Sequence, residues 1–229
     1  MLKLYIGNKN YSSWSMRPWV VLRQSGIQFE EVMVRFGDDP FTDNSSFKQA
    51  VMAVNPSGRV PVLVDDALAV WDTLAIAEYV AEKFPEKHLW PQNVAARARA
   101  RSVCAEMHSG FTSLRSACPM NIEASLPDVG AIIWRDKPGV RADVARIVNM
   151  WTELLAQHTG PMLFGEFSIA DAYFAPVCMR LRNYALPVPA NVSDYIQRVC
   201  ALPGVKAWLS DALAEKDFVG VDEPYRSHR

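Results

Sequence analysis

Three serines near the start of the chain stand where hydroxyl groups could do chemistry. They are Ser12, Ser13 and Ser15. They follow an apolar run over residues 2–7 and precede an apolar, helix-patterned segment that ends at Ser25. This order predicts hydroxyls at the first turn of a helix, where free amides and the positive end of the helix dipole stabilise an anion such as a thiolate or an oxyanion. The alternative is that the serines only cap the helix, since serine is a preferred cap and Pro18 suits a first turn.

A second motif, Asn-Pro-Ser-Gly-Arg-Val-Pro at residues 55–61, precedes the apolar run 62–64. Pro61 has no amide proton to donate to a sheet, so it belongs at a strand start or in a turn. If the Val60–Pro61 bond is cis, the backbone of Val60 faces outward and is able to pair with a bound peptide as an added strand. An ordinary trans turn is the alternative.

A third motif places an acid and a hydroxyl, Asp72 and Thr73, where a predicted strand meets a predicted helix. As structure, either residue is a helix cap that contributes roughly 0.5 to 2 kcal/mol. As function, the pair and the exposed amides beside it form a site for a ligand that bears both an ammonium and a carboxylate group. The motif taken alone leaves both interpretations open.

The elements that must position these motifs fall into two parts, because strand and helix signals alternate over the first 85 residues and nearly every later segment is helical in pattern. We expect strands at 3–7, 29–34, 60–64 and 67–71 and helices at 14–25 and 72–84. We expect further helices at 93–116, 141–159, 169–182, 192–201 and 205–215. These elements indicate an α/β domain over 1–85, a linker over 86–91 and an all-α domain over 92–229.

Composition narrows the class of protein. The 229 residues carry a formal net charge of -1, and no apolar stretch approaches the roughly 20 residues that cross a bilayer. We therefore expect a cytoplasmic globular protein with no nucleic-acid or membrane partner. Its four cysteines form no C-x-x-C pair and are expected to be reduced. Cys104 and His108 share a helix face, but two further ligands are missing, so we expect no metal site.

Together the three motifs, in this order and ahead of an all-helical region, resemble the glutathione transferase family over essentially the whole chain. The resemblance implies a thioredoxin-like N-terminal domain that binds glutathione and a helical domain that supplies most of the pocket for the second substrate. The run Ser-Ser-Trp-Ser-Met-Arg at 12–17 is similar to the S-S-C-x-W-R signature of zeta-class members. Trp14 stands where the zeta class has cysteine.

The resemblance assigns a catalytic hydroxyl to this turn. Ser12 matches the zeta-type serine, Ser13 is its rival because theta-type spacing selects it, and Ser15 is the third candidate. The chosen hydroxyl would donate a hydrogen bond to the glutathione sulfur and so favour the thiolate over the thiol. The thiolate is then the nucleophile, and neither a metal nor a protein nucleophile is required.

The resemblance also assigns the remaining groups of glutathione. The backbone of Val60 corresponds to the position that pairs with the cysteinyl part, and Pro61 corresponds to the family's cis-proline. Asp72 and Thr73 match the usual Glu/Gln-Ser pair at the γ-glutamyl group, although Asp72 is one methylene shorter than glutamate. Arg59 is a candidate cation for the glycyl carboxylate, and a solvated surface arginine is the alternative.

For the second substrate we expect a pocket near the linker-proximal helix and the serine turn. Its candidate residues are Tyr11, Trp14, His108 and Phe111. The predicted function is a homodimeric, detoxifying transferase that conjugates glutathione to a hydrophobic electrophile. The alternatives are a glutathione-dependent isomerase of maleylacetoacetate type, against which Trp14 counts, and a noncatalytic binding or assembly module.

A further family feature lies far from the expected ligand. Ser168 and Asp171 have the S-x-x-D spacing of a capping box at the start of an apolar helix. We expect this pair to stabilise the helical domain without contacting glutathione.

Overall fold

The computed structural model describes residues 1–37, 40 and 42–229, and it contains a four-stranded mixed sheet in its N-terminal part. The strands are β1 (Leu2–Ile6), β2 (Glu30–Met33), β3 (Val62–Asp65) and β4 (Leu68–Trp71), in the order β2-β1-β3-β4. β1 pairs in parallel with β2 and antiparallel with β3, which pairs antiparallel with β4. The predicted α/β unit is therefore confirmed.

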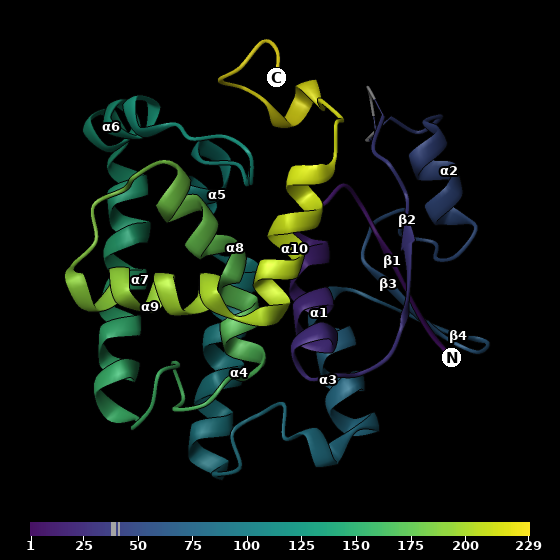
Figure 1. Cartoon of the computed structure of the whole chain (residues 1–229), viewed down its shortest axis with the longest axis horizontal. Helices are drawn as coiled ribbons and strands as arrows, with labels where there is room; N and C mark the ends of the chain where they lie inside the picture. The colour runs from purple at the N-terminus through teal and green to yellow at the C-terminus, as the bar shows by residue number, and fades with distance from the viewer. Residues whose placement is uncertain (38–39, 41) are drawn as a thin grey trace.

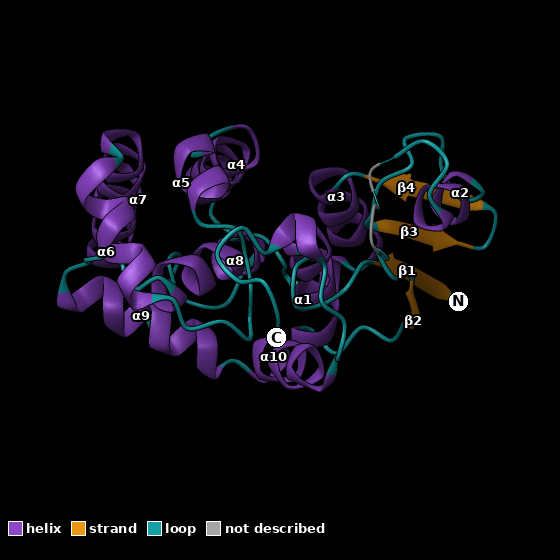
Figure 2. Cartoon of the chain, turned by 90° about the horizontal axis from the view of Figure 1, so that it is seen from above, coloured by secondary structure: helices purple, strands orange, loops and turns teal. Residues whose placement is uncertain are grey.

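Three helices cover this sheet: α1 (Ser13–Gln24), α2 (Ser46–Met52) and α3 (Thr73–Lys83). Because successive side chains of a strand point to opposite faces, Leu4 and Ile6 of β1 enter the large core with α1 and α3. Tyr5 packs on the other face against a smaller core that contains Phe47 of α2. Figure 2 shows α1 and α3 between the sheet and the helical part of the chain.

The rest of the chain is helical. After the short 3-10 turn Pro85–Lys87 it forms α4 (Val94–Ser109), α5 (Thr112–Ala117), α6 (Pro127–Asp136), α7 (Pro138–Gln157), α8 (Ile169–Asn183), α9 (Ala190–Ala201) and α10 (Pro203–Ala214). A final 3-10 turn spans Gly220–Asp222. α8 lies at the centre of this unit, and all but Arg182 of its 15 residues are buried. The predicted all-α second part is confirmed.

The two parts meet along α1, which packs against α8 and α10 (Figure 1). Trp19 of α1 and Trp208 of α10 meet edge to face, with ring centroids 5.3 Å apart. The ammonium of Lys9 lies 4.7 Å from the Trp19 ring centroid and 5.5 Å from that of Trp208, and it pairs with Glu31 and Asp211. The turn before α1 is thereby fixed to the C-terminal helix.

Three expectations about elements were wrong. The single helix expected over 93–116 is divided at Gly110 and Phe111, where the Phe111 backbone adopts a left-handed φ of 53° that a continuing helix excludes. The segment expected as a link between β2 and β3 contains α2, which Ser45 caps through Lys48 N–H. Helix α6, which begins at a proline, was not expected at all.

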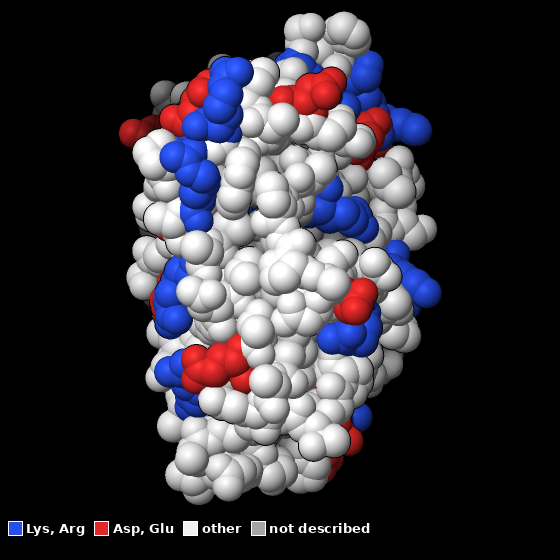
Figure 3. Space-filling model, turned by 90° about the vertical axis from the view of Figure 1, so that its left-hand side faces the viewer, with Lys and Arg blue, Asp and Glu red and all other residues white. Residues whose placement is uncertain are grey.

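No described helix is long and apolar enough to cross a membrane. All four cysteines are free thiols, and Cys104, Cys118 and Cys178 are buried. Figure 3 views the molecule from the side on which α6, α7 and α9 lie in Figure 1, and there basic and acidic groups alternate with wide uncharged areas. That face carries no continuous basic surface.

Candidate functional site

Ser12 is the N-cap of α1, and its Oγ accepts a hydrogen bond from the Ser15 N–H at 3.4 Å. The Ser12 Oγ also lies 2.7 Å from the Ser15 Oγ, to which it donates. The Ser15 hydroxyl is fully buried and accepts the Gly7 N–H at 3.1 Å. Strand β1 therefore fixes Ser15, and Ser15 fixes Ser12.

Ser13 is the first residue of α1 and faces a different partner. Its hydroxyl accepts a hydrogen bond from Arg180 Nη2 at 3.3 Å, and its carbonyl accepts one from Arg17 Nη1 at 2.9 Å. Arg17 is buried, and this burial lowers the pKa of its guanidinium to about 9. Two arginines therefore surround the first turn of the helix.

The Val60–Pro61 peptide bond is cis, as the family resemblance implies, and leads directly into β3. The loop before it is fixed by Asn55, whose side-chain amide donates to the Arg59 carbonyl at 3.1 Å. Arg59, Val60 and Pro61 all line a cavity of about 450 Å³.

Asp72 and Thr73 lie at the start of α3, and Asp72 caps this helix through the Leu74 N–H at 2.8 Å. Asp72 has a φ of 75°, a conformation that costs an L-residue energy and that often occurs at ligand sites. Its second oxygen lies 3.2 Å from the Nε2 of His108. The buried Thr73 hydroxyl accepts a hydrogen bond from Tyr173 at 2.9 Å, which leaves its own proton available.

The sequence motifs meet at two adjoining cavities. The cavity of about 450 Å³, here the Asp72 cavity, is lined by Trp14, Ser57, Arg59, Val60, Pro61, Trp71, Asp72, Thr73, His108 and Arg115. The second, of about 580 Å³, is the Ser12 cavity, and Tyr11, Ser12, Ser13, Met120, Arg180 and Asp222 are among its lining residues. Trp14, Ser57, Arg59, Val60 and Arg115 line both. The cis peptide therefore stands between the serine turn and the Asp72–Thr73 pair.

Trp14 lies at the junction of these cavities among cationic and aromatic groups. The guanidinium carbons of Arg17 and Arg115 lie 4.4 Å and 4.8 Å from its ring centroid. The His108 ring lies 5.1 Å from the Trp14 ring, centroid to centroid. A ring between two guanidinium groups is stabilised by cation–π attraction, so Trp14 has a fixed orientation in the site.

Tyr11 connects the site to the C-terminal tail. Its hydroxyl donates to the Glu223 carboxylate at 2.8 Å and accepts the Val219 N–H at 3.4 Å. Burial, and then the bond to Glu223, raise the pKa of Tyr11 to about 12, so this hydroxyl stays protonated at neutral pH. The tail is bound a second time by Glu215, whose carboxylate accepts the Lys9 N–H at 2.8 Å.

The structure places two expected site residues outside both cavities. Ser15 is fully buried and lines neither cavity, and its hydroxyl contacts that of Ser12. Phe111 packs in the hydrophobic core and lines neither cavity, because its left-handed backbone turns the chain between α4 and α5.

The sequence analysis missed four charged residues of the Ser12 cavity, Lys48, Arg115, Arg180 and Asp222. A signal for Arg180 existed, since it follows Tyr173 and Val177 at helical spacing and so shares their buried face. No local pattern marked Asp222, which reaches the cavity from the C-terminal tail.

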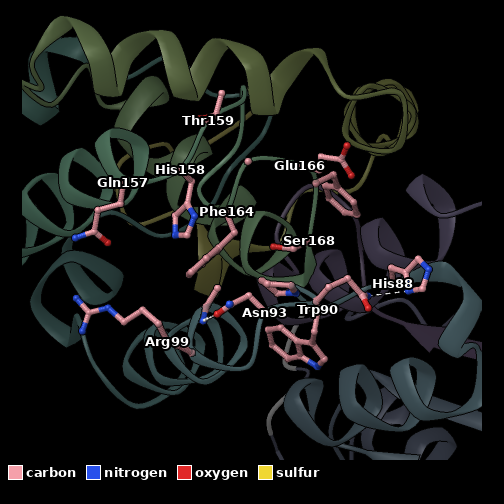
Figure 4. Close-up of a pocket in the computed structure, with 16 residues that line it drawn as sticks. His88, Trp90, Asn93, Arg99, Gln157, His158, Thr159, Phe164, Glu166 and Ser168 are labelled. Carbon is pink, nitrogen blue, oxygen red and sulfur yellow. Dashed lines mark hydrogen bonds between the residues drawn. The ribbon is translucent and has the colours of Figure 1, made fainter.

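A larger cavity, of about 730 Å³, lies elsewhere between the linker, α4 and the end of α7 (Figure 4). None of the expected site residues lines it. His158 and Phe164 contact each other there with ring centroids 5.1 Å apart. Among the described residues, no group of three or more His, Cys, Asp or Glu side chains is arranged to bind a metal.

The Ser168–Asp171 pair forms the expected capping box at the start of α8. The Asp171 carboxylate is fully buried and accepts hydrogen bonds from the Ser168 N–H at 2.9 Å and the Ser168 hydroxyl at 3.2 Å. It also accepts the Leu163 N–H at 3.2 Å and the Tyr195 hydroxyl at 3.0 Å. Burial raises the pKa of this carboxyl to about 6.

Comparison with known proteins identifies the same family that the sequence motifs resemble. The glutathione S-transferase N-terminal domain family matches residues 11–83, and the glutathione S-transferase C-terminal domain family matches residues 94–211. The glutathione S-transferase GstA of Escherichia coli O157:H7 is 29% identical over 216 residues, which cover 86% of this chain and 92% of that protein. The maleylacetoacetate isomerase of Pseudomonas aeruginosa is 27% identical over 194 residues, covering 82% of this chain and 85% of that protein.

The solved structures agree with these relatives. A glutathione transferase homologue from Burkholderia, with bound glutathione, superposes with a TM-score of 0.67 at 25% identity, covering 94% of this chain and 99% of the other. The two domain families together match well over half of the residues. This chain belongs to the glutathione S-transferase family.

Proposed function

We propose that this protein conjugates glutathione to a carbon electrophile, and that the Ser12 hydroxyl stabilises the glutathione thiolate. The observation that carries the proposal is the position of Ser12, which caps α1 and lines a cavity that adjoins the cis Val60–Pro61 peptide. A hydroxyl donor beside a helix N-terminus lowers the pKa of a thiol, because both groups favour the charged form.

Ser15 prepares Ser12 for this role. A hydroxyl carries one proton and two acceptor lone pairs, so the 2.7 Å contact between Ser12 and Ser15 also forms with Ser15 as the donor. That rotation leaves the Ser12 proton for the sulfur, while the Gly7 N–H keeps Ser15 in position. Ser13 stays the rival, because its hydroxyl accepts from Arg180 at 3.3 Å and keeps its own proton for a donor role.

The rest of glutathione is proposed to extend from Ser12 along Val60 toward Asp72. The backbone of Val60 pairs with the cysteinyl part, the Asp72 carboxylate accepts the γ-glutamyl ammonium, and the Thr73 hydroxyl donates to the γ-glutamyl carboxylate. Arg59 pairs with the glycyl carboxylate. Each of these four residues lines the Asp72 cavity, and each group offers the charge or the proton that its partner needs.

In the conjugation step the thiolate sulfur attacks the electrophilic carbon, a carbon–sulfur bond forms, and the leaving group departs with its electron pair. The protein supplies no covalent intermediate. Its contribution is to increase the thiolate fraction and to hold the two reactants in contact. Tyr11, from the wall of the Ser12 cavity, and Trp14, which lines both cavities, are proposed to contact the electrophile.

The test is calorimetric titration of glutathione into the wild type and the separate Ser12→Ala, Ser13→Ala and Asp72→Ala variants, with conjugation of a generic aromatic electrophile assayed on each. We expect Ser12→Ala to bind glutathione and to lose about 100-fold or more in conjugation, in the range reported for loss of one transition-state hydrogen bond. A wild type that binds no glutathione would instead be a noncatalytic module of this fold.

A glutathione-dependent isomerase is the second candidate, favoured by the similarity to the maleylacetoacetate isomerase of P. aeruginosa. Trp14 stands at the position of the zeta-class cysteine, so the conjugating function is preferred. Incubation with maleylacetoacetate separates the two, because turnover without consumption of glutathione is isomerisation.

We also propose that the protein is a cytoplasmic homodimer. Leu68 of β4 is about half exposed, and a second copy of the chain would cover it. Light scattering of the purified protein is expected to give twice the chain mass of 25.7 kDa. A mass of one chain at micromolar concentration would contradict the dimer.

A further inference from the structure

The charged residues that line the Ser12 cavity are mostly of one sign. Lys48, Arg59, Arg115 and Arg180 contribute cationic groups, whereas Asp222 is the single acidic residue among its described lining residues. The ammonium of Lys48 pairs with Asp43. Burial raises the pKa of Asp222 to about 6, so it is mostly ionised at neutral pH and offsets one of the three remaining positive charges. An excess of positive charge remains in a partly enclosed space.

Arg180 is the most deeply placed of these cations, with only 6% of its surface exposed. Its guanidinium donates to the carbonyls of Arg115 and Cys118 and to the Ser13 hydroxyl. These acceptors are all neutral, and no described carboxylate lies within ion-pair distance of it. Burial, and then the charge of Arg115, lower the pKa of Arg180 to about 10. A buried cation without an anion is costly.

Arg115 lies next to Arg180 and likewise makes no salt bridge to a described carboxylate. Its Nη1 donates to the carbonyls of His108 at 3.3 Å and Gly110 at 3.1 Å, and its guanidinium lies over Trp14. Within the described chain its Nε and Nη2 donors have no hydrogen-bond partner, and no carboxylate pairs with it. Backbone carbonyls therefore fix two guanidinium groups at one wall, where neither makes a salt bridge to a described residue, although the charge of Asp222 acts on Arg180.

In the function proposed above no charged group of glutathione is assigned to Arg115 or Arg180. Its two carboxylates and its ammonium are assigned to Arg59, Thr73 and Asp72, all from the N-terminal domain. Arg115 and Arg180 come from α5 and α8 of the helical domain and line the Ser12 cavity, and Arg115 also lines the Asp72 cavity. Their charge is thus directed at the second reactant.

We propose that the second substrate is an aromatic or unsaturated electrophile that bears a carboxylate, and that this carboxylate binds between Arg115 and Arg180. This rests on the conjugating function proposed above. Guanidinium groups bind carboxylates through paired, charge-assisted hydrogen bonds. Trp14 and Met120 line the same cavity and contact the apolar part of the substrate.

The test compares two electrophiles that differ in one group, 4-chloro-3,5-dinitrobenzoate and 4-chloro-3,5-dinitrobenzamide. Each kcat/KM is divided by the rate constant of the uncatalysed reaction with glutathione, which removes the difference in intrinsic reactivity. We expect the wild type to favour the carboxylate by about 10-fold or more, the effect of one charge-assisted hydrogen bond.

Arg115→Gln and Arg180→Gln are the test variants, and Arg115→Lys keeps the charge where a glutamine variant is unstable. We expect each glutamine variant to lose about 10- to 100-fold with the carboxylate and much less with the carboxamide. The matched control is Arg182→Gln, an exposed arginine on the same helix that bonds to Asn183 and Cys200. It is expected to keep the wild-type preference.

The possible failures are distinguishable. If the wild type conjugates the carboxamide and shows no preference for the carboxylate, this assignment is overturned and the proposed function stands. If the glutamine variants lose both reactions equally and bind glutathione more weakly by calorimetry, the arginines serve glutathione and the assignment is overturned. If the wild type conjugates neither compound, the proposed function is overturned, and this assignment is overturned with it.

Discussion

The capping box of α8 allows the effect of one mutation to be worked out in detail. In Ser168→Ala the hydroxyl that donates to Asp171 at 3.2 Å is lost, while the backbone N–H of residue 168 still reaches the carboxylate. Loss of a capping side chain costs about 0.5 to 2 kcal/mol. Because this cap is buried and belongs to the central helix, we expect the free energy of unfolding to fall by about 1 to 2 kcal/mol.

Asp171→Ala extends the same argument. It leaves the Leu163 N–H, the Ser168 N–H and the Tyr195 hydroxyl without their acceptor in the protein interior. An unsatisfied buried donor costs about 1 to 3 kcal/mol, so the three together predict a loss of at least about 3 kcal/mol. A loss of that size is a large part of the stability of a typical protein, so we expect Asp171→Ala to be far less stable than the wild type.

Urea denaturation measures both losses, and Ser45→Ala is the matched control. Ser45 caps the peripheral helix α2 through the Lys48 N–H at 3.1 Å, and we expect its loss to cost less than that of Ser168. Glutathione binding by Ser168→Ala should equal that of the wild type, because Ser168 does not line either site cavity. A loss below about 0.5 kcal/mol for Ser168→Ala would refute the reasoning.

Three further predictions follow from other contacts. Burial raises the pKa of Asp171 from 3.8 to about 6, so the folded state favours the protonated carboxyl. The resulting contribution to stability is complete below about pH 4, falls by about 3 kcal/mol as the pH rises, and is lost above about pH 6. Urea unfolding of the wild type and of non-titrating Asp171→Asn between pH 4 and 7.5 checks this, and a pH-independent difference between them would exclude it. Asp72→Asn should weaken glutathione binding about 10-fold in calorimetry by removing a charge-assisted hydrogen bond, whereas the exposed Asp66→Asn should not. Tyr11→Phe removes the bond to Glu223 and should speed tryptic cleavage at Lys216, and equal rates for both proteins would mean that Tyr11 does not restrain the tail.

The features found from sequence depend on short-range patterns. Strand alternation and helix periodicity predicted the sheet and most helices. The family resemblance joined the proline motif to Asp72–Thr73, and these residues line one cavity. The break after α4 was missed because apolar spacing continues across it, although Gly110, which caps the end of α4, is a typical helix stop. The left-handed Phe111 that precedes α5 has no such local marker. Helix α2 is only seven residues long, too short for a periodic signal.

The parts of the site that were missed depend on contacts distant in sequence. Arg180 reaches Ser13 across 167 positions, and Tyr11 reaches Glu223 across 212. Such pairs follow from the packing of α1 against α8 and α10 and not from any local pattern. Ser15 was assigned to catalysis for the same reason, because spacing alone does not reveal that β1 buries its hydroxyl.

The central claim is that Ser12 stabilises the glutathione thiolate, and titration of the bound thiol tests it most directly. The ultraviolet absorbance of the thiolate, followed against pH in the complex, gives the pKa of the bound thiol in the wild type, Ser12→Ala and Ser13→Ala. We predict a pKa below that of free glutathione in the wild type, a rise of at least about one pH unit in Ser12→Ala, equal to about 1.4 kcal/mol, and a smaller change in Ser13→Ala. A bound thiol with the same pKa in the wild type and in Ser12→Ala would contradict the account.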